Sequence, residues 1–112
     1  MARSPTTADV FNAIAEGSRR DLINAIGDGE LTVNELVEKL NISQPQVSRH
    51  LNVLRSVNLV LVRTDWRHRW YRVNGPALKP IHDWVRPFER TWNARLDRLE
   101  DLLNEVQSKE ES

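Results

Sequence analysis

Apolar residues recur every three or four positions through the first half of the chain, a pattern that predicts short amphipathic helices. The clearest case is residues 44–55, where Val47, Leu51 and Leu54 lie at positions i, i+4 and i+7. Most of the intervening residues are polar or basic, and none is a carboxylate. We expect a helix with one buried face and one face suited to the phosphates and base edges of DNA.

Capping-box patterns mark four helix starts, because a Ser or Thr is followed three positions later by an acidic residue or Gln. The four pairs are Thr6–Asp9, Ser18–Asp21, Thr32–Glu35 and Ser43–Gln46. We expect Gly17 to end the first helix and residues 27–29 to form a turn after the second. The third and fourth helices, separated by Asn41-Ile42, predict a helix-turn-helix over about residues 32–57.

The hydrophobic period changes from 3.6 to 2 after Asn58, a residue suited to the left-handed position that ends a helix. Residues 59–64 and 69–73 read as the two strands of a β-hairpin, with residues 65–68 at its tip. A helix-turn-helix followed by such a hairpin, here about residues 59–73, is a winged helix. The tip of this wing carries Arg67, His68 and Arg69, which we expect to reach a phosphate or the minor groove.

A helical pattern returns near residue 79 and continues to about residue 106. Pro87 lies inside it, and we expect it to kink or split the helix. We expect the polar tail, residues 107–112, to be disordered. So long an apolar stripe cannot be buried on so small a body, which predicts a homodimer through the first and last helices. Its predicted interface residues are Val10, Phe11, Ile14, Trp84, Phe88, Trp92, Leu96 and Leu99.

The fold class is therefore mainly α with a small β-hairpin: four helices, two strands and a long fifth helix. The 112 residues fit a single domain. The formal net charge is zero, but residues 42–73 hold six arginines against Asp65 alone. The segments on either side are net acidic, so the basic charge gathers on the predicted recognition helix and wing.

Composition excludes several classes of site. The chain has no cysteine, which removes disulfides, thiolate metal sites and a cysteine nucleophile. It has no Gly-rich phosphate loop, nucleophile elbow or HExxH motif, so we expect neither an enzyme nor a cofactor. No apolar run is long enough for a membrane span or a signal peptide, and we expect a soluble cytoplasmic protein associated with the nucleoid.

The candidate DNA-contacting residues lie on the recognition helix and the wing. Two of them have a structural alternative: Gln46 reads adenine or only closes the capping box of Ser43, and His50 binds a phosphate or braces the preceding helix. The full set is Gln44, Gln46, Ser48, Arg49, His50, Asn52, Arg67, His68 and Arg69.

The expected partners are operator DNA and a second copy of the chain, with the recognition helices in successive major grooves of a palindrome. One alternative is a winged helix that binds proteins and has lost DNA binding. Another is a metal-responsive repressor with ligands among His50, His68, His82 and neighbouring aspartates. The sequence specifies no inducer.

Residues 43–55, Asn58-Leu59-Val60 and the end of the wing at Tyr71 resemble the ArsR/SmtB family of bacterial winged-helix repressors. The resemblance runs from about Val10 to Leu103. It implies a dimeric DNA-binding repressor, often of its own operon, that a metal or another signal releases.

The chain departs from the metal-sensing pattern of that family. Members that bind arsenic or cadmium carry two cysteines where this chain has Thr32 and Asn34. Zinc-type members carry Asp and His ligands on the last helix, where this chain has only His82 beside Asp83. The chain therefore resembles the metal-independent branch, which includes autorepressors.

Overall fold

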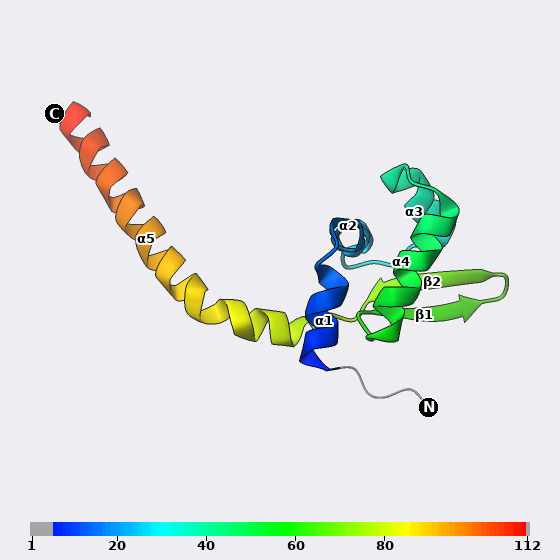
Figure 1. Cartoon of the computed structure of the whole chain (residues 1–112). Coiled ribbons are helices and arrows are strands. Elements are labelled where there is room, and N and C mark those ends of the chain that lie inside the picture. Colours follow the sequence, from blue (N-terminus) through cyan, green and yellow to red (C-terminus); the bar gives the residue numbers. More distant parts are fainter. Residues whose placement is uncertain (1–5, 112) are drawn as a thin grey trace. The chain divides into compact units, whose positions relative to one another are not determined.

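The computed structural model describes residues 6–111, which fall into two compact parts, one ending at Ile81 and one beginning at His82. The first part contains the predicted helices and hairpin in the predicted order, so the fold class is confirmed (Figure 1). The described elements are α1 (Thr7–Ile14), α2 (Gly17–Ile26), α3 (Val33–Leu40), α4 (Gln44–Ser56), β1 (Val60–Asp65), β2 (His68–Val73), the 3₁₀ helix η1 (Gly75–Leu78) and α5 (Lys79–Glu111).

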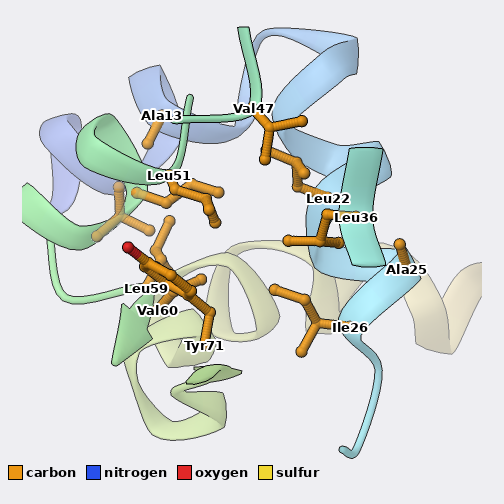
Figure 2. Close-up of a cluster of buried hydrophobic side chains, with 12 residues drawn as sticks. Ala13, Leu22, Ala25, Ile26, Leu36, Val47, Leu51, Leu59, Val60 and Tyr71 are labelled. Carbon is orange, nitrogen blue, oxygen red and sulfur yellow. The ribbon is translucent and has the colours of Figure 1, made fainter. Parts of the chain in front are cut away.

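The hydrophobic core lies where α1 to α4 meet the root of the hairpin (Figure 2). The apolar stripe of α4 is its centre, because Val47, Leu51 and Leu54 are at most 1% exposed. Leu22 of α2 and Leu36 of α3 pack against this stripe and are fully buried. Burying a side chain of this kind contributes about 1.5–3 kcal/mol, so the stripe fixes which face of α4 meets solvent.

Val10 also belongs to this core, with 6% exposure. The prediction that it lies at a dimer interface is wrong, because its side chain is already covered by its own chain. The spacing in α1 could not separate a residue facing the core from one facing a second subunit. Phe11 and Ile14 of the same helix stay half-exposed.

Two arginines of α2 hold the end of α1. Their guanidinium groups donate to the last carbonyls of that helix, Arg19 to those of Asn12 and Ala13, and Arg20 to those of Ile14 and Ala15. Arg19 also pairs with Glu16 at 2.7 Å. Cationic groups here satisfy carbonyls that the helix leaves unbonded, and they oppose the negative end of its dipole.

The predicted capping box of α2 is wrong. The N-cap is Glu16, whose side chain makes no capping hydrogen bond, and Ser18 lies inside the first turn. α1 ends at Ile14 and α2 begins at Gly17, so the link is short and the start of α2 lies ahead of Ser18. The other three predicted boxes are confirmed: Thr6–Asp9, Thr32–Glu35 and Ser43–Gln46.

The hairpin pairs from Val60 opposite Val73 to Asp65 opposite His68, which leaves a turn of two residues, Trp66 and Arg67. The predicted four-residue tip was therefore too long, and both strands extend further toward the turn. On its other side β2 pairs with Leu31, whose backbone exchanges hydrogen bonds of 3.0 and 2.9 Å with Tyr71. This bridge fixes the hairpin to the segment between α2 and α3.

The root of the hairpin is fixed to the end of α4. Asn58 has the predicted left-handed conformation, with φ of 63°. The side-chain amide of Asn74 donates to the Asn58 carbonyl at 2.9 Å, and its backbone N–H donates to Leu59 at 2.9 Å. The strand therefore leaves the recognition helix at a defined angle.

α5 is one unbroken helix that includes Pro87, so the proline does not split it. The helix continues to Glu111, and the expectation of disorder is wrong for residues 107–111; Ser112 lies outside the described residues. The acidic and basic side chains of this last segment tolerate helix well. Within residues 6–111 no helix combines the length and apolar content needed to cross a bilayer.

We expect Arg19→Met to lower the free energy of unfolding by about 1–3 kcal/mol, because it removes charge-assisted hydrogen bonds from a side chain that is only 14% exposed. Urea unfolding followed by circular dichroism measures this. Arg72→Met is the matched control, since Arg72 is exposed and has no partner within residues 6–111. Equal stability of the two variants would contradict the capping role.

Candidate nucleic-acid interface

The polar face of α4 is presented to solvent because the opposite face is buried. Gln44, Gln46, Arg49 and Asn52 are exposed, and Ser48 is half-buried. Arg49 and Asn52 make no hydrogen bond or ion pair within residues 6–111. The helix therefore carries a guanidinium and an amide that its own fold does not use, and both groups can donate to base edges.

The start of α4 is held by its capping box. Oε1 of Gln46 accepts from the backbone N–H and the hydroxyl of Ser43 at 3.2 and 3.0 Å, and the Ser43 hydroxyl accepts from the Gln46 N–H. The capping alternative for Gln46 is thus confirmed. Its Nε2 has no partner in the described chain and can still donate to a base. Gln44 donates to the Ser48 hydroxyl at 3.2 Å, which fixes both side chains on one face.

His50 is a correction to the predicted DNA contacts. It is 4% exposed, and its Nε2 lies 3.7 Å from Glu16 at the start of α2. Its position on α4 lies between the buried Val47 and Leu54, so its ring enters the core and does not reach solvent. The charged group that it approaches, Glu16, belongs to the link between α1 and α2.

The wing presents a second basic surface, which we call the wing tip and define as residues 66–69. Arg67, His68 and Arg69 are all exposed. The Arg67 guanidinium lies 4.8 Å from the centre of the Trp66 ring, and that of Arg69 lies 6.0 Å from the ring of Tyr71. These cation–π contacts orient the two arginines and leave them charged toward solvent.

Arg63 of β1 serves the fold, although it lies in the basic segment. Its Nε donates to both oxygens of Glu30 at 3.0 and 2.8 Å. This hydrogen bond raises the pKa of Arg63, with the charges of Glu30 and Asp65 adding to the effect. The ion pair ties β1 to the segment before α3, and no sequence motif predicts it.

An open hollow of about 470 Å³ lies between the start of α3, the start of α4 and β2. It brings Gln44 of the recognition helix together with Arg67, His68 and Arg69 of the wing tip. Arg49 and Asn52 lie farther along α4 and do not line it. Sequence reasoning missed the remaining lining residues, which are Thr32, Val33, Asn34, Glu35 and Trp70.

Comparison with known proteins agrees with this arrangement. Residues 16–61, which contain the helix-turn-helix, match the model of the bacterial regulatory protein arsR family. The chain is 32% identical to the HTH-type transcriptional regulator Rv2034 of Mycobacterium tuberculosis, over 91% of each chain. The chain belongs to the arsR family. It is therefore a DNA-binding transcriptional regulator.

Other relatives in the family match less of the chain. The transcriptional repressor SdpR of Bacillus subtilis is 29% identical over 71% of this chain and 89% of its own. A solved structure described as a possible transcriptional regulator for arsenical resistance has a TM-score of 0.63 and 36% identity. That match covers 81% of this chain and 92% of the solved chain.

Within this arsR-family fold, Thr32 and Asn34 both lie at the start of α3. Thr32 is the N-cap of α3 and accepts from the Glu35 N–H at 3.3 Å. Asn34 is an exposed residue in the first turn of the same helix. Among residues 6–111, no three His, Asp or Glu side chains are placed to hold a metal ion.

We expect Ser43→Ala to lower the free energy of unfolding by about 1 kcal/mol, because it removes the N-cap of α4. Arg49→Ala is expected to change it by less than about 0.5 kcal/mol, since Arg49 has no partner in the described chain. Urea unfolding of both variants measures these changes in the free energy of unfolding. It distinguishes Ser43, which stabilises the helix, from Arg49, which the helix exposes to solvent. A large loss for Arg49→Ala would show that its side chain stabilises the fold.

Proposed function

We propose that this protein is a homodimeric repressor that reads a palindromic operator with α4 and grips the flanking backbone with the wing tip. The observation that carries the proposal is the convergence of Gln44 and the wing-tip arginines around one open hollow, beside an exposed α4 face without carboxylates. Gln44, Gln46, Ser48, Arg49 and Asn52 contact bases or the nearby backbone, and Arg67, His68 and Arg69 contact phosphates or the minor groove. Repression follows if the bound dimer blocks polymerase.

The relative SdpR is described as a transcriptional repressor, which supports repression as the result of DNA binding by this protein. The absence of cysteine from the sequence supports regulation without a thiolate metal site, and we place the protein among metal-independent regulators that repress their own operon. The whole chain acts as one winged-helix unit, with α5 serving dimerisation.

The exposed stripe of α5 supports dimerisation. Its side chains recur at three- or four-residue spacing, and large apolar residues on it are 50–61% exposed: Trp84, Phe88, Trp92, Leu96, Leu99, Leu102, Leu103 and Val106. An apolar surface of this extent marks an interface. Phe11 and Ile14 of α1 add half-exposed apolar surface.

The charges of α5 favour an antiparallel pair of these helices. The first half of α5 is mainly basic: it contains only three acidic residues, against the arginines Arg86, Arg90, Arg95 and Arg98. The second half, from Glu100 onward, is mainly acidic. Antiparallel helices place the basic half of one copy beside the acidic half of the other, whereas parallel helices place like charges together. The stripe from Trp84 to Val106 is centred near Arg95, so antiparallel pairing about that point covers all of it.

Fluorescence anisotropy of a labelled duplex from the upstream region of the gene tests DNA binding, with a scrambled duplex as the reference. If about six phosphates are neutralised per dimer, the slope of log affinity against log salt is expected near −5. Arg49→Ala is expected to lose about tenfold or more on the operator and little on the scrambled duplex, because a bidentate base contact is worth about 1–3 kcal/mol.

Arg72→Ala is the control for that variant, since it removes an exposed arginine without a partner in the described chain and leaves α4, the wing tip and the α5 charges intact. Zinc and a chelator are each expected to leave the affinity unchanged. Absence of binding to either duplex at low salt would overturn the proposal in favour of a protein-binding module. An equal loss for Arg49→Ala on both duplexes would contradict base reading by Arg49.

Leu99→Glu is expected to convert the dimer into a monomer, because it places a carboxylate in the apolar stripe. Light scattering coupled to gel filtration at micromolar concentration measures the mass. Asn104→Glu introduces the same charge on a polar face of α5 and is expected to remain dimeric. A wild-type monomer, or a Leu99→Glu dimer, would refute the interface.

A further inference from the structure

Trp66 occupies a backbone position that does not suit its side chain. It is the first residue of the two-residue turn of the wing, and its φ is 59°. Glycine is the usual residue at such a position, because a Cβ is crowded there. Among the described non-glycine residues, only Asn41, Asn58 and Trp66 have positive φ, and asparagine tolerates it well. A bulky aromatic residue in this conformation therefore carries strain that glycine would remove.

No packing inside the fold offsets this strain. The Trp66 side chain is 82% exposed, the highest value among the exposed large apolar residues. The ring makes a cation–π contact with the guanidinium of its neighbour Arg67, which lies 4.8 Å from the ring centre. Strained residues cluster at functional sites. We therefore look for a contact between the exposed indole and another molecule.

The surroundings of the ring favour nucleic acid as that molecule. Arg67, His68 and Arg69 follow Trp66 in the chain and supply donors and positive charge, and the one carboxylate beside them, Asp65, lies 3.8 Å from Arg63. The same arginines line the hollow that contains Gln44, and Trp66 directly precedes them in the chain. A purely apolar protein partner would have to desolvate these cations, whereas a polyanion neutralises them.

We propose that Trp66 is a DNA-contacting residue that packs its ring against the sugar edges of the minor groove, while Arg67 binds the adjacent phosphate. Apolar side chains at the ends of arms and wings enter this groove in other DNA-binding folds, and sugar contacts position a protein on the duplex. This assignment rests on the proposed DNA-binding function and extends it to a residue that carries no charge.

The test compares Trp66→Gly, Trp66→Phe and Arg67→Ala in the anisotropy titration at several salt concentrations. Trp66→Gly is expected to weaken operator binding by about tenfold with the salt slope unchanged, because the ring neutralises no phosphate. Trp66→Phe is expected to retain most of the affinity. Arg67→Ala is expected to make the slope shallower by roughly 1–2, since each subunit loses a phosphate contact.

Two controls separate a lost contact from an altered backbone. Thermal unfolding of Trp66→Gly is expected at the wild-type temperature or above it, because glycine relieves the strain. Asn58→Gly places a glycine at the other end of the wing, also at positive φ, and is expected to bind DNA like the wild type.

Unchanged affinity of Trp66→Gly would overturn the assignment, as would a loss that appears only as a shallower salt slope. A Trp66→Phe variant as weak as Trp66→Gly would show that ring packing is not the contact. In each of these cases the wild type still binds its operator selectively. Failure of the wild type to bind would instead overturn the proposed function itself.

Discussion

The burial of one face of α4 is the interaction on which the rest of the structure depends. Val47, Leu51 and Leu54 are the residues through which the other helices and the hairpin root share one core. The same burial decides that Arg49 and Asn52 point outward. One face of α4 thus stabilises the fold and the other is presented to solvent, and a one-residue shift in register, a rotation of about 100°, would move polar residues of α4 toward the core.

The helices around α4 are short, and side chains from neighbouring elements complete their ends. Arg19 and Arg20 bind the last carbonyls of α1, and Lys39 of α3 donates to Ala25 near the end of α2 at 2.8 Å. Helices of 8 to 10 residues are marginal in isolation. Each of these basic side chains donates hydrogen bonds to carbonyls of a neighbouring helix. The same contacts therefore stabilise the helix ends and hold the helices against one another.

Local signals predicted most of this fold, and long-range contacts caused the errors. Ser43 and Gln46 form the box that their spacing predicts, because both partners lie within one turn. Ser18 and Asp21 have the same spacing and do not form one, because α2 already begins at Gly17 and Ser18 lies inside its first turn. The hydrophobic period placed α4 correctly, but it could not predict that a polar residue, His50, enters the core beside Glu16.

The candidate DNA-binding surface was predicted to a similar extent. Exposed residues of α4 and the wing tip could be read from sequence, since periodicity and charge locate them. The pairing of Arg63 with Glu30 could not, because 33 positions separate the two residues and neither belongs to a recognisable motif. The hollow that joins Gln44 to the wing tip depends on that same tertiary placement. Trp66 did have a signal, an aromatic residue at a turn, but its strained backbone became visible only in three dimensions.

The hairpin is fixed at three places, by Asn74 to Asn58, by Leu31 to Tyr71 and by Glu30 to Arg63. Residues 64–70, which include the turn, lie beyond these attachments. Substitutions near the root of the wing therefore disturb the core. Substitutions at residues 66 and 67 leave the core intact and change the surface that the wing presents to a partner. If the wing tip contacts the DNA backbone as proposed, two descendants of this protein that differ at these two side chains would hold DNA with different strength while α4 still selected the bases.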